Sequence, residues 1–187
     1  SIASLMAAPL NATKTESLDW NWKFARFGKM PDGSTQPEPG KAMGFATATS
    51  EESGNPADNA VDGDKSTRWC AASGKSGEKI TVDMGRPVDV KTVNILWEKQ
   101  SNHLFKLEGS GDGKRWATIE DKTSGQNDSK EDTVENKTGK PRYFRITVTG
   151  NNQSNWASIR EITFKNDKGE IIRPQAAAGT SKADNPS

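Results

Sequence analysis

A regular series of short alternating runs occupies the middle of the chain, from about residue 41 to residue 165. In 79–83, Ile80 and Val82 fall on one face, and in 92–97 every second residue is again apolar. A period of two is typical of strands that bury one face. Eight such runs are present, at 44–49, 79–83, 92–97, 105–110, 116–119, 132–135, 143–148 and 159–164.

Turn signals separate these runs, as in 111–113 (GDG), 138–141 (TGKP) and 150–152 (GNN). Short strands punctuated this regularly predict an all-β fold, an antiparallel β-sandwich or a barrel. No part of this region shows the apolar spacing of an amphipathic helix more strongly than the spacing of a strand. The sequence also lacks a repeat of 20–50 residues, which argues against a propeller or a solenoid.

The two ends of the chain differ from this middle region. Residues 1–40 form a predicted N-terminal flank, with a leader, a candidate strand at 18–27 and a Pro- and Gly-containing linker at 28–40. The apolar stretch 2–10 suits either the tail of a secretory signal or a plain disordered leader. Residues 167–187 form a C-terminal flank that we expect to be mostly disordered.

Charge and composition exclude several classes of function. The 26 basic and 25 acidic residues nearly cancel, which removes the basic excess expected of a nucleic-acid-binding protein. A single cysteine, Cys70, excludes an internal disulfide framework, and one histidine and one cysteine disfavour a zinc site. A G-x-S-x-G elbow and a P-loop are both missing from the sequence, so we expect the chain itself to be non-catalytic.

Four local patterns, in order along the chain, carry a resemblance to a known family. They are 59–69 (NAVDGDKSTRW), 80–85 (ITVDMG), 109–116 (GSGDGKRW) and 157–162 (ASIREI). Together they resemble the discoidin domain, of the coagulation factor 5/8 C-terminal type, whose bacterial members include the family 32 carbohydrate-binding modules. The resemblance covers about residues 41–166. It implies an eight-stranded, jelly-roll-like β-sandwich.

The first pattern contains a candidate metal site. Asp62 and Asp64 flank Gly63 and precede Thr67, and hard cations such as calcium prefer oxygen ligands of these kinds. An ordinary Asp-Gly turn is the alternative. The resemblance implies a structural calcium that ties two distant loops together. Its implied ligands are the side chains of Asp62, Thr67 and Glu161 and the backbone oxygens of Asn59, Asp64 and Arg160.

Trp156 is the candidate ligand platform, because it follows a polar segment, 150–155, in which nothing periodic would bury it. An aromatic surface with a few placed polar groups suits a sugar, although Trp156 could instead cap one end of the sandwich. Trp69, Trp97 and Trp116 are expected in the core. The resemblance places ligands on loops at one end of the sandwich, and we expect 98–104 to be such a loop. The candidate hydrogen-bonding residues, each alternatively a solvated loop residue, are Glu98, Asn102, His103, Asn152 and Asn155.

The flanks carry a second, shorter resemblance. Residues 20–24 (WNWKF) resemble the first strand of the N-terminal domain of family 2 glycoside hydrolases, and 183–187 (ADNPS) resembles a later A-D-x-P segment of those enzymes. This implies that the discoidin domain is inserted into, or fused to the start of, a larger glycosidase of the β-galactosidase kind.

These observations predict a monomeric, non-catalytic carbohydrate-binding module of a larger bacterial glycoside hydrolase. We expect the protein to be secreted, periplasmic or on the cell surface, with glycans and the parent enzyme as partners. The alternative is a structural module that only packs against its host enzyme. Membrane binding is disfavoured, because the loops are rich in Asn, Gly, Ser and Lys and present no apolar spikes.

Overall fold

The computed structural model describes residues 44–150 and 156–177. The elements are β1 (Ala46–Ala48), the 3-10 helix η1 (Ala57–Val61), β2 (Trp69–Cys70), β3 (Glu78–Asp83), β4 (Thr92–Asn102), β5 (Leu104–Ser110), β6 (Ala117–Lys122), β7 (Asp128–Glu135), β8 (Tyr143–Gly150), β9 (Ser158–Lys165) and β10 (Ile171–Ile172). The candidate strand at 18–27 lies outside the described residues. Within the described ranges, no helix has the length and apolar character needed to cross a bilayer.

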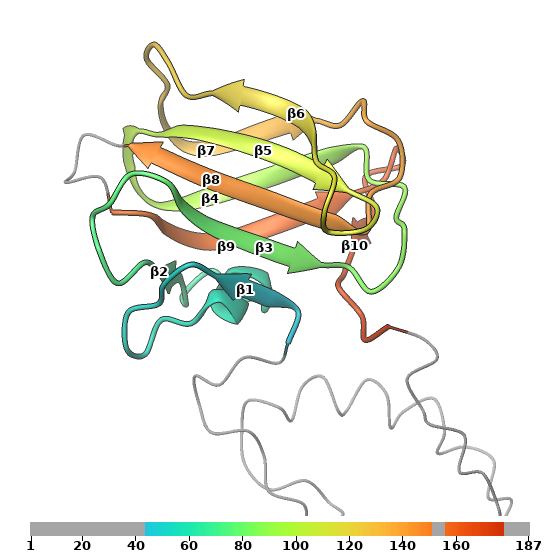
Figure 1. The fold of residues 1–187 in the computed structure, drawn as a ribbon, viewed down its shortest axis with the longest axis horizontal. Coiled ribbons are helices and arrows are strands. Elements are labelled where there is room, and N and C mark those ends of the chain that lie inside the picture. Colours follow the sequence, from blue (N-terminus) through green and yellow to red (C-terminus); the bar gives the residue numbers. More distant parts are fainter. Residues whose placement is uncertain (1–43, 151–155, 178–187) are drawn as a thin grey trace, which may run out of the picture. The chain divides into compact units, whose positions relative to one another are not determined.

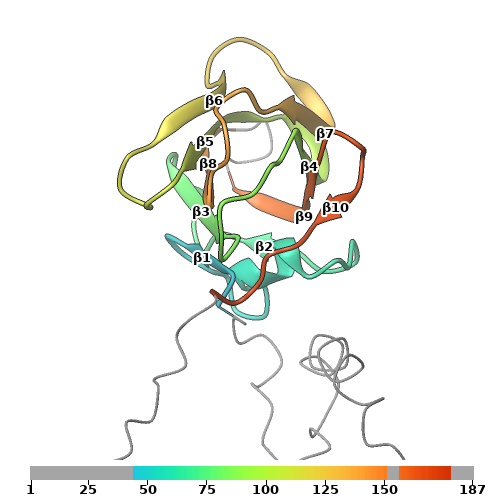
Figure 2. The ribbon, with the colours of Figure 1, turned by 90° about the vertical axis from the view of Figure 1, so that its right-hand side faces the viewer.

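Two antiparallel sheets make up the domain. One has the strand order β1-β3-β8-β5-β6, and the other has the order β10-β9-β4-β7, with β2 also paired to β9. Figure 1 shows the strands of both sheets running along the length of the domain, and the end-on view of Figure 2 shows the sheets facing each other. The predicted all-β antiparallel sandwich is therefore confirmed.

Alternating side chains from both sheets fill the core. In β8 every second residue is buried, and the same alternation holds in β3 from Glu78 to Val82. Trp69 and Trp97 are fully buried, as predicted. The other large buried side chains include Phe105, Phe144 and Phe164.

Trp116 corrects the prediction that three tryptophans lie in the core. Its ring is only half-buried and lies against Arg145, whose guanidinium carbon is 4.0 Å from the ring centroid. The physical reason is the position of the preceding turn. The Asp112 carboxylate accepts hydrogen bonds from the backbone N–H groups of Lys114 and Arg115, both at 2.8 Å, and β6 begins only at Ala117.

The segment 98–104, predicted as a loop, is instead mostly strand. β4 continues to Asn102 and β5 starts at Leu104, which leaves only His103 between the two strands. The pairing of β4 with β7 is irregular after Leu96 and resumes at Ser101. This irregularity interrupts the alternation of apolar residues, so the period of two ends in the sequence before the strand ends in the structure.

Both ends of the described domain attach to the same point, the end of β3. The backbone N–H of Asp83 donates to the carbonyl oxygen of Phe45 at 2.7 Å, and the N–H of Gln175 donates to that of Met84 at 3.2 Å. The two ends of the described domain are therefore held at two consecutive residues, the last residue of β3 and the one that follows it.

Candidate functional site

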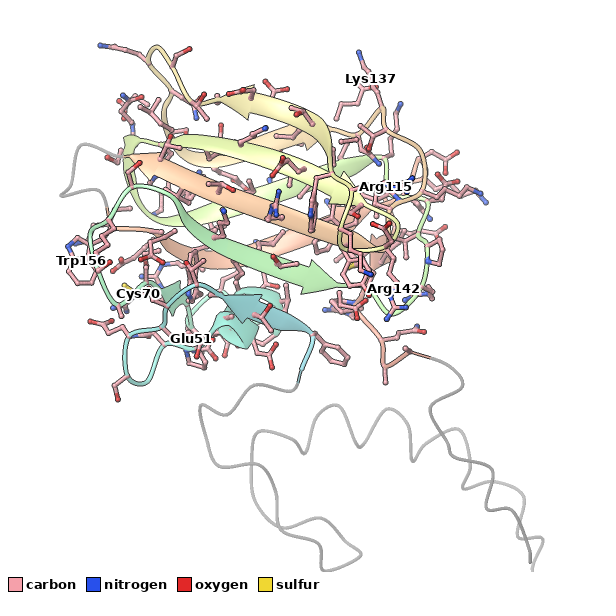
Figure 3. The ribbon with its side chains drawn as sticks, in the orientation of Figure 1. Glu51, Cys70, Arg115, Lys137, Arg142 and Trp156 are labelled. Carbon is pink, nitrogen blue, oxygen red and sulfur yellow. The ribbon has the colours of Figure 1, made fainter. Side chains whose placement is uncertain are left out.

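Trp156 lies at the end of the sandwich where the chain passes from β8 to β9, and Figure 3 shows it at the opposite end from Arg115. Its side chain is 39% exposed. The next residue, Ala157, is fixed to the neighbouring segment, because its carbonyl oxygen accepts a hydrogen bond from the N–H of Ala71 at 2.9 Å. The backbone next to Trp156 is therefore held in place, just before β9 begins at Ser158.

A buried carboxylate holds the surrounding loops in place. Glu78 accepts hydrogen bonds from the hydroxyl groups of Thr49, Ser50 and Ser73. Burial by itself would raise the pKa of Glu78, but the three hydroxyl donors outweigh it and lower the pKa. Glu78 is therefore an ionised anchor that joins two loops at the Trp156 end, 49–50 and 71–77.

Arg68 is a surface residue at this end that the sequence reasoning missed. Its Nη2 lies 3.7 Å from a carboxylate oxygen of Glu52, and its Nε lies 3.6 Å from one of Glu98. Within the described ranges, the buried Nε of Arg68 has no hydrogen-bond partner. A signal was present in the sequence. Arg68 directly precedes Trp69 in the NAVDGDKSTRW pattern, so a charged residue stands next to a buried tryptophan at the start of β2.

Apart from His103, the other predicted ligand contacts have three different outcomes in the structure. Glu98 remains partly exposed beside Arg68. The amide oxygen of Asn102 accepts a hydrogen bond from the backbone N–H of Asn127, which commits this oxygen to the protein itself. Asn152 and Asn155 lie outside the described residues.

His103 differs most from its predicted role, because it is only 5% exposed. Its ring is stacked on Trp97, and its Nε2 lies 2.8 Å from the carbonyl oxygen of Lys99. Burial lowers the pKa of His103, which favours the neutral imidazole. His103 is thus a packed part of the scaffold beneath the loop end.

A second set of polar groups, from the predicted metal site, gathers around Thr67. Its hydroxyl group lies 2.6 Å from Oδ2 of Asp62, 3.0 Å from the carbonyl oxygen of Asp64 and 3.4 Å from that of Asn59. Four oxygen atoms therefore converge where η1 runs into the following turn. Arg160 approaches the same turn with its guanidinium, which donates to the carbonyl oxygens of Lys65 and Ser66.

Glu161, on β9, completes this cluster from a distant part of the chain. Its Oε1 accepts a hydrogen bond from the N–H of Gly63 at 3.2 Å, whereas its buried Oε2 has no hydrogen-bond partner in the described structure. Burial, and then the negative charge of Asp62, raises the pKa of Glu161 to about 8. A buried carboxylate with one oxygen that has no hydrogen-bond donor, close to the charge of a second carboxylate, is an arrangement that a bound cation would stabilise.

The composition of this cluster suits a hard cation. Among residues 44–150 and 156–177, no three His, Cys, Asp or Glu side chains gather as a metal-binding group. The oxygen atoms that converge on the Thr67 hydroxyl come from the carboxylate of Asp62 and from the backbone carbonyls of Asn59 and Asp64. Such mixed oxygen shells are typical of calcium, whereas zinc sites use nitrogen and sulfur.

Several carbohydrate-binding modules of known structure are similar to this chain. The CBM32 of AlyQ, solved in complex with 4,5-unsaturated mannuronic acid, is 29% identical to this chain, and the match covers 66% of this chain and 95% of that one, with a TM-score of 0.55. Chitosan-binding module 1 of a chitosanase/glucanase from Paenibacillus sp. IK-5 is 27% identical and covers 64% of this chain and 92% of its own, with a TM-score of 0.58. The module CpGH89CBM32-4 from Clostridium perfringens is 26% identical over the same shares, with a TM-score of 0.57.

No curated protein sequence gives a significant match to the chain. The family model of the F5/8 type C domain matches residues 45–162, which is more than half of the chain and spans both the Trp156 end and the oxygen cluster. The chain therefore belongs to the F5/8 type C, or discoidin, domain family.

Proposed function

We propose that this chain is a non-catalytic carbohydrate-binding module whose glycan site lies at the loop end carrying Trp156. The observation that carries the proposal is the exposure of Trp156 on an anchored backbone, beside loops that Glu78 holds in place. The similar structures support it, because one is described with a bound mannuronic acid derivative and another as chitosan-binding.

The surrounding residues supply the chemistry that a sugar requires. The indole of Trp156 offers an apolar surface for the C–H groups of a sugar ring, while Arg68 donates to hydroxyl groups and Glu98 accepts from them. Asn152 and Asn155, which precede Trp156 in the sequence, remain proposed contacts. A partly exposed platform of this kind buries little area, so we expect the affinity for one sugar unit to be modest.

Calorimetric titration after a glycan-array screen tests this site. We expect Trp156→Ala to weaken binding at least about tenfold, a loss of about 1.4 kcal/mol. The matched control is Ile171→Ala, because Ile171 on β10 is the other large exposed apolar side chain of the described structure. Equal losses in the two variants would contradict the assignment. Failure to bind any glycan would favour the alternative of a structural module that packs on a host enzyme.

We also propose that the oxygen cluster binds a structural calcium ion. The side chains of Asp62, Thr67 and Glu161 and the backbone oxygens of Asn59, Asp64 and Arg160 would hold it. When bound, the ion supplies positive charge between two carboxylates and joins the turn after η1 to β9. The unpartnered Oε2 of Glu161 is the observation that supports this proposal.

Thermal unfolding with calcium, with magnesium and after chelation tests the calcium proposal. Calcium at about 100 times its Kd is expected to stabilise the folded state by about 2.7 kcal/mol, because only the folded state offers the complete site. Glu161→Gln should abolish the calcium-dependent rise in Tm, whereas Glu52→Gln, an exposed carboxylate outside the cluster, should retain it. An unchanged Tm in the native sequence with calcium would refute the proposal.

We further propose that the module belongs to a larger, secreted or surface-bound bacterial glycoside hydrolase of the β-galactosidase kind, and that it acts as a monomer. One solved relative supports a shared chain, since truncated AlyQ carries a CBM32 and an alginate lyase domain together. A module of this type raises the local concentration of its enzyme at the glycan. Mass measurement of the native protein from culture supernatant and from cells tests both the size and the location.

A further inference from the structure

A cavity of about 270 Å³ lies at the end of the sandwich opposite Trp156. It lies between the turn 111–116 and the segment 138–141, and Figure 3 shows Arg115 at this end. The lining residues are Gly109, Ser110, Gly111, Arg115, Trp116, Ala117, Thr138, Lys140 and Pro141. The volume is slightly below the range of about 300–1,000 Å³ that drug-sized ligands occupy, so one small cyclic ligand suits it better than an oligomer.

Trp116 gives this cavity an aromatic wall. The guanidinium of Arg145 lies 4.0 Å from the ring centroid and is itself held by Glu108, so the indole is supported from the protein side. The backbone of Gly109 packs closely against Pro141, because a Cβ atom at Gly109 would lie only 2.8 Å from Cγ of Pro141. The cavity therefore presents a fixed aromatic side chain next to a proline ring.

The rim of the cavity is cationic. Arg115 and Lys140 line it, and neither forms an ion pair within the described part of the chain. The turn also contains a carboxylate, Asp112, but hydrogen bonds from the backbone of Lys114 and Arg115 occupy it and lower its pKa to about 2. The turn itself is the main partner of Asp112, and the nearby charge of Arg115 contributes less to the lowered pKa. A ligand carboxylate would therefore bind Arg115 close to an ionised Asp112, with Lys140 as the second cation.

We propose that this cavity binds an anionic sugar residue, of the uronate class, as a site separate from the one at Trp156. The carboxylate would pair with Arg115, whose planar guanidinium matches a carboxylate in bidentate fashion, and with Lys140 as a point charge. The sugar ring would pack against Trp116. The charges favour this cavity over the Trp156 end as the site for an anionic sugar. At the Trp156 end the cation Arg68 is already paired with two carboxylates, Glu52 and Glu98.

Titration of the full chain with glucuronic acid and galacturonic acid, and with glucose and galactose as neutral counterparts, tests the proposal. We expect uronate binding that Arg115→Gln and Lys140→Gln each weaken by roughly ten- to a hundredfold, as expected for the loss of a charged hydrogen bond. Binding should also weaken as the salt concentration rises. The matched control is Lys75→Gln, an exposed cation of the 71–77 loop, which should change nothing.

The variant Trp156→Ala keeps this proposal distinct from the proposed glycan site. Uronate binding that survives Trp156→Ala and falls in Arg115→Gln supports the second site, whatever happens to neutral glycans. Uronate binding that falls in Trp156→Ala and survives Arg115→Gln overturns it, as does the absence of uronate binding. Inorganic sulfate that binds as tightly as the uronates, with both indifferent to Trp116→Leu, overturns the sugar assignment and leaves a simple anion site.

Discussion

The imidazole of His103 lies parallel to the indole of Trp97, with ring centroids 4.1 Å apart and 6° between the planes. The same indole donates its Nε1 hydrogen to the buried carboxylate of Asp132 at 2.7 Å. Trp97 therefore connects the His103 turn to β7. This stack and its carboxylate lie beneath the end of the sandwich that carries the proposed glycan site.

Stability should depend on pH through His103. Burial lowers its pKa, while the Lys99 carbonyl oxygen and the charges of Asp132 and Asp128 oppose the shift. In the unfolded chain the pKa returns to about 6.5, so the unfolded state binds more protons between the two values. The contribution of His103 is thus fully present above about pH 6.5 and is lost as the pH falls through its lower, folded-state pKa.

Urea unfolding at pH 7.5 and at pH 5 measures this effect. Glu161, whose pKa is raised to about 8, acts in the opposite direction over this range in both proteins, so the effect of His103 is the difference between them. Lowering the pH should therefore cost the native sequence more unfolding free energy than His103→Phe, which retains an aromatic ring. Equal changes in both proteins would mean that His103 is not the titrating group.

Asp132→Asn should destabilise the domain by about 2–4 kcal/mol, because removing one partner of a buried charge network leaves the others uncompensated. The carboxylate accepts hydrogen bonds from Trp97, Ser129 and Lys122, and an amide would direct its own N–H groups at these donors. Burial alone would raise the pKa of Asp132, but its donors outweigh it and lower the pKa. Denaturant unfolding gives the value. Asp128→Asn, an exposed carboxylate on the same strand, should cost under about 0.5 kcal/mol.

The two motif tryptophans should differ in their contribution to stability. Trp69 is fully buried and donates its Nε1 hydrogen to the carbonyl oxygen of Ser50, so Trp69→Ala should cost about 3–5 kcal/mol. Trp116→Ala removes a half-buried ring and its contact with Arg145, for which about 1–2 kcal/mol is expected. Thermal unfolding of both variants in parallel measures the difference. A larger loss for Trp116 would contradict its placement outside the core.

Gly85→Ala should detach the segment 173–177 from the sandwich. Gly85 has φ = 79°, and a Cβ atom there would lie 2.0 Å from the carbonyl oxygen of Gln175. Gly125→Ala is the matched control, because Gly125 has φ = 84° but nothing within 4 Å of its Cβ position. The control bears the left-handed backbone cost of about 1–2 kcal/mol, and Gly85→Ala should exceed it. Limited proteolysis should cleave the 173–177 segment faster in Gly85→Ala alone.

The alternation of apolar residues predicted most of the fold, because a strand with one buried face leaves a period of two in the sequence. β3 and β8 show this directly. β4 does not, since its last residues follow an irregularity in pairing and carry the polar sequence Glu98-Lys99-Gln100. The half-burial of Trp116 depends on where β6 begins, which no local pattern specifies.

The candidate sites were predictable to different degrees for similar reasons. Asp62 and Thr67 lie five residues apart, so a single turn brings them together. Glu161 reaches this turn through Gly63, from which it is 98 residues distant, and was assigned only through the family resemblance. The surroundings of Arg68 come from two other segments, those of Glu52 and Glu98. The burial of His103 required the stack on Trp97, for which a lone histidine in the sequence gives no signal.

The attachment of Phe45 to Asp83 and of Gln175 to Met84 brings the two ends of the described domain to one place. In the proposed larger enzyme, a loop into which the sandwich is inserted would have both of its ends at this one place, so the entropic cost of closing that loop would change little. Arg142, which is bonded to Asp83, and Trp156 lie at opposite ends in Figure 3. Trp156 therefore lies at the end of the sandwich that is far from the attachment point at Asp83 and Met84, where the proposed enzyme would leave it accessible to a glycan.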